Sequence, residues 1–178
     1  MGLVVSYDPQ TEGNLRFLLT LRSSELKHHS GQVCLPGGRV DESESQNPLR
    51  ALDREFFEEV KLPIGSIEWV QEGPWEALFS RHGVKVFPYL GFVSETQAEQ
   101  IEISSFEVAE HVWLPLSWLF DEHHWRVRTF ITDRTTPARS VALPIWVGWQ
   151  HVTWGLTAGM LALFVRRISG RSPIEPAL

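Results

Sequence analysis

The sequence of 178 residues predicts an α+β fold or a mixed-sheet sandwich, and two observations lead to that class. Many short segments rich in β-branched and aromatic residues are bounded by turn residues, as strands are. Only residues 48–60 and 156–168 have the length and the apolar pattern of substantial helices. The chain carries neither an internal repeat nor a low-complexity linker, so we expect one domain over residues 1–178, ending in a loose tail at residues 169–178.

The expected strands are spread over the whole chain and are separated by loops. Residues 25–31 form a polar loop, and Pro36-Gly37-Gly38 stop the strand that precedes them. Residues 126–132 and 140–143 are expected to pair as a hairpin, and residues 116–120 to form a short helical turn. The other strands are expected at residues 3–6, 16–21, 33–35, 67–71, 75–80, 84–93 and 110–115.

The first helix is signalled at both of its ends. Asn47 is a good N-cap, Pro48 suits the first helical turn, and Pro63 lies just beyond the expected end. The apolar residues that recur at helical spacing are Leu49, Leu52, Phe56 and Val60. The second helix falls in the most apolar stretch, residues 154–165, which is shorter than the roughly 20 residues that a membrane-spanning helix needs. We therefore expect a buried helix and no membrane partner.

Composition narrows the class of protein further. The hydrophobic fraction of 43% and the charged fraction of 21% are those of a globular chain. The net charge is −6, whereas a nucleic-acid binder usually carries a basic face, so we expect no nucleic-acid partner. Cys34 is the only cysteine, which excludes an intrachain disulfide and a cysteine-based zinc site. With no signal-peptide pattern at the start of the chain, these features favour the cytoplasm.

Much of the negative charge lies in residues 38–59, which hold seven acidic and three basic residues. A solvated helix face is the ordinary explanation of such a run. On a helix, however, Glu55 and Glu59 lie one above the other, and Glu58 flanks the same face. Three carboxylates this close repel one another unless a cation neutralises them, and hard oxygen ligands select Mg²⁺ or Mn²⁺.

The residues around these carboxylates suit a phosphate ligand. Mg²⁺ in proteins commonly holds substrate phosphates. The Gly37-Gly38 turn, just upstream, can fold back tightly and bring backbone carbonyl oxygens near a ligand. Arg54 can orient a neighbouring carboxylate by a bidentate contact. The segment therefore predicts a metal-dependent phosphate site, with a solvated acidic face as the alternative.

The same segment resembles the Nudix hydrolase signature, Gly-x5-Glu-x7-Arg-Glu-U-x-Glu-Glu-x-Gly-U, in which U is a bulky aliphatic residue. Gly38 and Glu44 match its first half, and the run Arg-Glu-Phe-Phe-Glu-Glu-Val-Lys-Leu, which begins at Arg54, matches its second half. The spacer from Glu44 to Arg54 has nine residues instead of seven, so we expect the loop before the helix to bulge. Phe56 replaces an aliphatic residue, and Lys61 replaces the final glycine.

This resemblance implies a Nudix-type α/β/α sandwich with a mixed β-sheet and a catalytic loop-helix-loop. It implies that Glu55 and Glu59 bind Mg²⁺ or Mn²⁺ and that Glu58 binds the ion directly or through water. Gly38 is the remaining residue expected at the metal. Enzymes of this kind use water to break a diphosphate linkage that is joined to another group.

A second motif resembles the extra signature of the coenzyme A pyrophosphatase branch, Leu-Leu-Thr-x-Arg-Ser-x3-Arg-x3-Gly-x3-Phe-Pro-Gly-Gly. It starts at Leu18 and keeps every spacing, with Lys27 in place of an arginine and Leu35 in place of a phenylalanine. The branch implies a substrate site that includes Arg22, Lys27, Gly37 and Gly38. Later landmarks extend the resemblance over nearly the whole chain, namely Gly83, Val86, Pro88, Glu107-Val108, Leu114-Pro115-Leu116 and residues 154–158.

Together, the two motifs imply hydrolysis of coenzyme A or an acyl-coenzyme A to 3′,5′-ADP and 4′-phosphopantetheine. Glu58 is the first candidate for the general base, Glu44 is the second, and Arg54 completes the catalytic set. The alternatives are a Nudix diphosphatase acting on ADP-ribose, a dinucleotide or a nucleoside triphosphate, and a non-catalytic Nudix binding domain. Such a binding domain would usually have lost a metal carboxylate, whereas all three stand here. A homodimer is the oligomeric state that we allow for.

Overall fold

The computed structural model describes residues 1–8, 13–70, 76–80, 83–133 and 139–174. The chain divides into two compact units, Met1–Leu116 and Ser117–Leu178, each with β-structure of its own. Gln71 and Trp75, at which two of the expected strands end and begin, lie outside the described residues. The single-domain organisation expected from the sequence stays a prediction.

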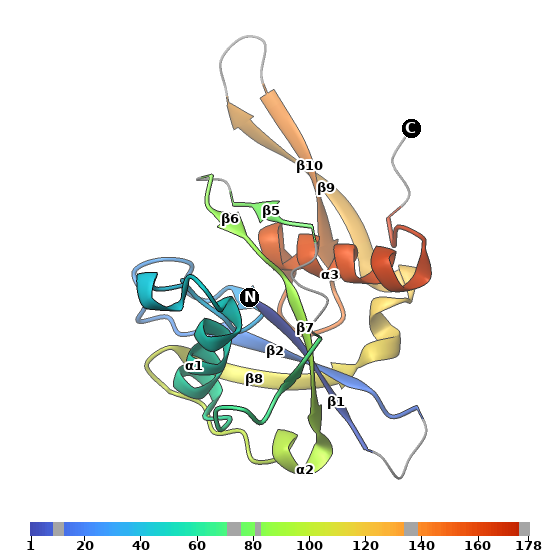
Figure 1. Cartoon of the computed structure of the whole chain (residues 1–178). Coiled ribbons are helices and arrows are strands. Elements are labelled where there is room, and N and C mark those ends of the chain that lie inside the picture. The colour runs from blue at the N-terminus through green and yellow to red at the C-terminus, as the bar shows by residue number, and fades with distance from the viewer. Residues whose placement is uncertain (9–12, 71–75, 81–82, 134–138, 175–178) are drawn as a thin grey trace. The chain divides into compact units, whose positions relative to one another are not determined.

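The first unit is built on a six-stranded mixed sheet (Figure 1). Its strands are β1 (Gly2–Tyr7), β2 (Arg16–Arg22), β3 (Val33–Cys34), β4 (Glu68–Trp69), β7 (Tyr89–Ser94) and β8 (Val108–Pro115). β1 runs parallel to β7, and every other pair in this sheet is antiparallel. The mixed sheet that the sequence predicts is therefore confirmed.

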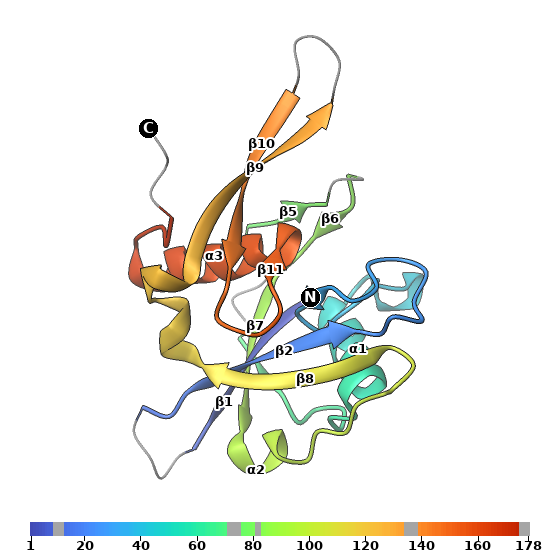
Figure 2. The same cartoon turned by 180° about the vertical axis from the view of Figure 1, so that it is seen from behind.

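β2 is the central strand because three others pair with it. β8 lies along one edge of β2, as Figure 2 shows, over the whole length from Arg16 to Arg22. On the other edge, β1 pairs with the start of β2, and β3 pairs with Thr20 and Leu21 near its end. The antiparallel register places the Arg22 backbone beside Gln32, just before β3, and the Arg22 N–H donates to the Gln32 carbonyl oxygen at 3.0 Å.

The helix α1 (Pro48–Val60) has the bounds that the sequence predicts. The Asn47 side chain caps it, since its Oδ1 accepts a hydrogen bond from the Leu49 backbone N–H at 3.3 Å. The apolar side of α1 joins the sheet in one core cluster, which includes Leu52, Phe56, Val60, Val4, Leu18, Trp69 and Tyr89. This packing fixes the position of the helix that carries the three glutamates.

α1 ends at Val60, and the backbone of the next residue, Lys61, lies in the left-handed region at φ +56°. Its N–H donates to the Phe57 carbonyl oxygen at 3.2 Å and so closes the last turn. A side chain in this conformation costs about 1 kcal/mol relative to glycine. This left-handed backbone explains why the Nudix signature has a glycine at the position of Lys61. The replacement by lysine removes none of the carboxylates.

One expected strand of the first unit is interrupted at a proline, and three others are shorter than expected, namely β3, β4 and the strand at Leu78–Phe79. The strand expected at residues 84–93 is two strands, β6 (Lys85–Val86) and β7, because Pro88 between them has no N–H to donate to a ladder. β6 pairs with β5 (Leu78–Phe79) in a two-stranded sheet. The short helices η1 (Glu42–Glu44) and α2 (Glu95–Ala98) were not predicted, since neither is long enough to show a helical period.

The second unit holds a three-stranded antiparallel sheet and a helix. The predicted hairpin is confirmed as β9 (Trp125–Asp133) and β10 (Arg139–Trp146), and β11 (Thr153–Trp154) pairs with β10. The short helices are η2 (Leu116–Leu119), which confirms the predicted helical turn, and η3 (Glu122–His124). α3 (Gly155–Ser169) buries most of its apolar residues, as expected. Within the described ranges, no helix combines the length and the apolar character needed to cross a membrane.

Candidate functional site

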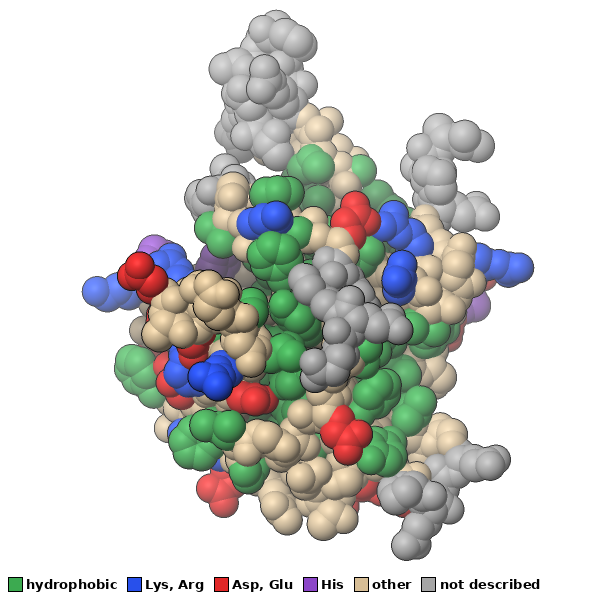
Figure 3. Space-filling model, viewed as in Figure 1, with side chains coloured by type: hydrophobic (Ala, Val, Ile, Leu, Met, Phe, Trp, Pro, Cys, Tyr) green, Lys and Arg blue, Asp and Glu red, His purple; other side chains and the backbone are tan. Residues whose placement is uncertain are grey.

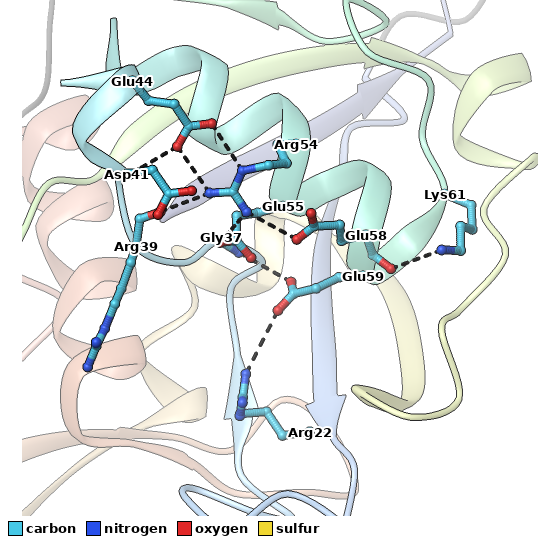
Figure 4. A network of polar contacts seen from close by, with 10 residues as sticks. All are labelled: Arg22, Gly37, Arg39, Asp41, Glu44, Arg54, Glu55, Glu58, Glu59 and Lys61. Carbon is cyan, nitrogen blue, oxygen red and sulfur yellow. Dashed lines mark hydrogen bonds and ion pairs between the residues drawn. The ribbon is translucent and has the colours of Figure 1, made fainter. Parts of the chain in front are cut away.

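Arg54 is the centre of a polar network on α1, and its guanidinium uses all five N–H groups (Figure 4). Nε and Nη2 donate to the two carboxylate oxygens of Glu44 at 3.0 and 3.1 Å. Nη1 donates to Glu55 Oε1 at 3.0 Å and to Glu58 Oε2 at 3.1 Å. The remaining N–H of Nη2 donates to the Arg39 carbonyl oxygen at 3.0 Å. One arginine thus connects the loop before α1 with two of the glutamates on the helix.

Glu44 reaches Arg54 from the short helix η1. The Asp41 backbone N–H donates to Glu44 Oε2 at 3.0 Å, and the Asn47 N–H donates to the Glu44 carbonyl oxygen at 2.8 Å. The turn between η1 and α1 therefore holds Glu44 in reach of Arg54, although the spacer is two residues longer than in the signature. Hydrogen bonds from Arg54 lower the pKa of Glu44, and those bonds raise the pKa of Arg54 in turn.

Glu59 is the most buried of the three helix glutamates, with 3% of its surface exposed. Its Oε2 accepts a hydrogen bond from the Gly37 N–H at 3.2 Å, and its Oε1 lies 3.8 Å from Arg22 Nη1. Burial raises the pKa of Glu59 to about 7, because these two partners compensate only part of the lost hydration. The site therefore holds a carboxylate whose negative charge is poorly compensated.

Glu55 lies directly against Gly38. A Cβ atom at position 38 would overlap the Glu55 carboxylate, so only glycine leaves room for it. Burial raises the pKa of Glu55, the Arg54 guanidinium lowers it, and Glu58 and Glu107 raise it further as like charges. Both glycines of the turn thus lie against a glutamate of α1. Gly37 donates its N–H to Glu59, and Gly38, which has no side chain, leaves room for the Glu55 carboxylate.

Glu107 is a charged neighbour that the sequence analysis did not place at the site. It acts as a like charge on both Glu55 and Glu59. Its turn is tied to α1, since the Ser104 N–H donates to the Glu59 carbonyl oxygen at 3.0 Å. Glu107 appeared in the sequence only as a landmark of the branch, because no local pattern brings it to a helix so distant along the chain.

The donor set suits a divalent cation. Glu55, Glu58 and Glu59 offer carboxylate oxygens, which Mg²⁺ and Mn²⁺ prefer, and the raised pKa values of Glu55 and Glu59 reflect charge that a cation would compensate. Among the residues that the structure describes, no three His, Cys, Asp or Glu side chains converge as they stand on one metal position. Arg54 bonds to one carboxylate oxygen of Glu55 and one of Glu58, so a cation held by both residues would have to draw these oxygens away from Arg54 or use the other oxygen of each carboxylate.

The remaining expected residues lie at different distances from this cluster. Arg22 is brought to it by the end of β2, and acidic and basic side chains gather side by side over α1 and the preceding loop (Figure 3). Lys27 is exposed and forms no ion pair with a described residue. Hydrogen bonds, an ion pair and close packing therefore connect the other expected site residues to one another.

The chain is similar in sequence to known proteins. A family model described as "NUDIX domain" matches residues 2–133. The peroxisomal coenzyme A diphosphatase ndx-8 of Caenorhabditis elegans is 30% identical over 172 residues, which cover 96% of this chain and 69% of that protein. The uncharacterized Nudix hydrolase NudL of Escherichia coli K12 is 33% identical over 150 residues, covering 81% of this chain and 70% of its own length.

Solved structures resemble the fold at lower identity. A MutT/nudix family protein from Enterococcus faecalis aligns with a TM-score of 0.53 and 18% identity, over 96% of this chain and 66% of that one. An Ap4A hydrolase binary complex from C. elegans aligns with a TM-score of 0.50 and 23% identity, over 65% of this chain and 80% of that one. At these identities the likeness concerns the fold alone, and it confirms the expected sandwich class.

Proposed function

The chain belongs to the Nudix hydrolase family, and on that premise we propose that it hydrolyses the diphosphate linkage of coenzyme A or an acyl-coenzyme A. The products would be 3′,5′-ADP and 4′-phosphopantetheine or its acyl form. One contact carries the proposal: Arg22, from the motif typical of the coenzyme A branch, is ion-paired with Glu59, from the Nudix signature. The two motifs therefore meet at one site.

The cation is proposed to be Mg²⁺ or Mn²⁺, held by Glu55 and Glu59, with Glu58 and the Gly38 carbonyl oxygen as further ligands. When bound, such an ion supplies positive charge to the diphosphate oxygens. Glu59 would be oriented for this role by the Gly37 N–H, and Glu55 by its seat against Gly38. Arg54 would keep the loop and the helix in register.

The chain's own residues would then direct the attack of water on phosphorus. The water oxygen forms a bond to phosphorus, the bond from phosphorus to the bridging oxygen breaks, and a proton of the water passes to a carboxylate. Glu58 suits this role because its side chain is 47% exposed and can meet a water molecule. Glu44 suits it less, because Arg54 holds both of its oxygens and lowers its pKa.

Positive side chains near the cluster would bind the substrate's phosphates. The Arg22 guanidinium lies beside Glu59 and would face a diphosphate bound at that carboxylate. Lys27 is exposed on the loop that follows β2, and none of the contacts within the carboxylate cluster involves it. We therefore assign Arg22 the larger share of diphosphate binding.

The test is hydrolysis of coenzyme A, ADP-ribose, NADH and a nucleoside triphosphate, each with Mg²⁺ or Mn²⁺, followed by product masses. We expect the highest kcat/KM for coenzyme A or an acyl-coenzyme A and the two product masses given above. Faster cleavage of ADP-ribose, NADH or the triphosphate would favour another Nudix diphosphatase activity. Tight binding of coenzyme A without cleavage would favour a non-catalytic binding domain.

A further inference from the structure

Arg39 stands beside the site but takes no part in the carboxylate network with its side chain. Its carbonyl oxygen accepts a hydrogen bond from Arg54 Nη2 at 3.0 Å. The two preceding residues are also held by α1, Gly37 by its hydrogen bond to Glu59 and Gly38 by its contact with Glu55. Three consecutive residues of this loop are thus fixed against the helix, so the base of the Arg39 side chain has a defined position relative to the carboxylates.

The Arg39 guanidinium is exposed and forms neither a hydrogen bond nor an ion pair with a described residue. This distinguishes it from the other two arginines at the site. All five Arg54 N–H groups are used, and Arg22 faces Glu59. Arg39 therefore has a complete planar set of donors to offer to a ligand, in the form that binds a phosphate bidentately.

The direction of the side chain indicates which phosphate it can reach. Figure 4 shows Arg39 extending away from Glu44, Glu55, Glu58 and Glu59. Arg39 is thus suited to a charged group that is attached to the substrate at some distance from the diphosphate.

On the basis of the proposed function, we propose that Arg39 binds the 3′-phosphate of coenzyme A and makes the enzyme select substrates that carry it. Dephospho-coenzyme A has the same diphosphate and pantetheine arm but lacks this phosphate. ADP-ribose and NADH lack it too. Arg39 then determines specificity and has no part in the bond-breaking step.

The experiment compares kcat/KM for coenzyme A and dephospho-coenzyme A in the wild type, Arg39→Gln and Arg39→Lys. Arg50→Gln is the matched control, because Arg50 is exposed on α1 and its replacement removes the same charge. Loss of a charge-assisted bidentate contact should lower kcat/KM for coenzyme A about tenfold or more in Arg39→Gln. It should change kcat/KM for dephospho-coenzyme A less than about twofold, and Arg39→Lys should lie between.

Two results would overturn the inference while leaving the proposed function in place. One is an equal loss with both substrates, which would put Arg39 at the diphosphate. The other is a wild-type enzyme that cleaves coenzyme A but does not prefer it to dephospho-coenzyme A. A wild type that cleaves neither, while cleaving another diphosphate under the same conditions, would instead reject the proposed function and the inference together.

Discussion

The Arg54 guanidinium and the Glu44 carboxylate are joined by two parallel hydrogen bonds, at 3.0 and 3.1 Å. The pair connects η1 with the middle of α1 and so fixes the loop that carries Gly37 and Gly38. Charge-assisted bonds of this bidentate kind are both strong and specific in geometry. The position of this loop relative to α1 therefore depends on an arginine at residue 54.

Arg54→Lys tests that dependence. Lysine keeps the charge but cannot make the fork, so we expect the free energy of unfolding to fall. We expect kcat/KM to fall by one to two orders of magnitude, on the order of what misplaced catalytic groups cost. Urea unfolding and steady-state kinetics measure the two effects. Arg50→Lys, on the exposed side of the same helix, should leave both unchanged, and equal behaviour of the two variants would contradict the role of Arg54.

Gly38→Ala tests the space that Glu55 occupies. The added Cβ would overlap the Glu55 carboxylate and force it away from its position. Gly38 does not lie in the left-handed region, so alanine meets no backbone strain there. We expect kcat/KM to fall about 100-fold with little change in thermal stability. Val40→Ala, two residues on and exposed, is the control and should remain active. A fully active Gly38→Ala would show that Glu55 need not stay where it lies.

Lys61→Gly tests the left-handed end of α1. Glycine adopts this backbone without the cost of about 1 kcal/mol that a side chain incurs at φ +56°. Lys61→Ala removes the same contacts, including the bond from Lys61 Nζ to the Glu58 carbonyl oxygen, but keeps the Cβ. We expect Lys61→Gly to be about 1 kcal/mol more stable than Lys61→Ala in urea unfolding. Equal stability of the two variants would mean that the helix end relaxes to another conformation.

The stability of the metal-free protein should depend on pH through Glu59. Its pKa of about 7 in the folded protein lies above the ordinary 4.5, so the folded state keeps a proton that the unfolded chain releases. The contribution of Glu59 to stability is therefore greatest below pH 4.5 and declines as the pH rises toward 7. Glu59→Gln, which cannot ionise, should gain stability relative to the wild type over this range.

The gain should be on the order of 3 kcal/mol at its upper limit. Urea unfolding of both proteins in EDTA at pH 5 and at pH 7.5 measures it. The difference between the two proteins isolates Glu59 from the other titrating groups. A difference that stays constant with pH, or that changes with the opposite sign, would contradict the raised pKa.

The sequence predicts well those elements whose signals lie within the element itself. α1 has the predicted bounds because its cap at Asn47, the proline that follows and the apolar stripe all lie within the segment itself. The prediction of one continuous strand at residues 84–93 was wrong. The apolar pattern of this segment favours a single strand, but Pro88 has no N–H to donate and divides it into β6 and β7. The parallel pairing of β1 with β7 could not be predicted, since it joins segments that are distant in sequence.

Some residues of the site can likewise be predicted from local sequence, and others only from the fold. The carboxylate spacing on α1 and the glycine turn are local features, and the structure brings Gly37 to Glu59 and Gly38 to Glu55. The approach of Glu107 depends on where β8 begins beside β2, which no local pattern indicates. The cation, the homodimer, the cytoplasmic location and the role of each site residue stay predictions.

Turnover of coenzyme A by the wild type and by Glu59→Gln tests the central claim most directly. The substitution keeps the size of the side chain and an oxygen for the Gly37 N–H but removes the charge that a cation needs. In Mg²⁺ or Mn²⁺ the wild type should yield the masses of 3′,5′-ADP and 4′-phosphopantetheine. Glu59→Gln should yield neither while unfolding as cooperatively as the wild type. Full activity of Glu59→Gln would contradict a metal site built on α1.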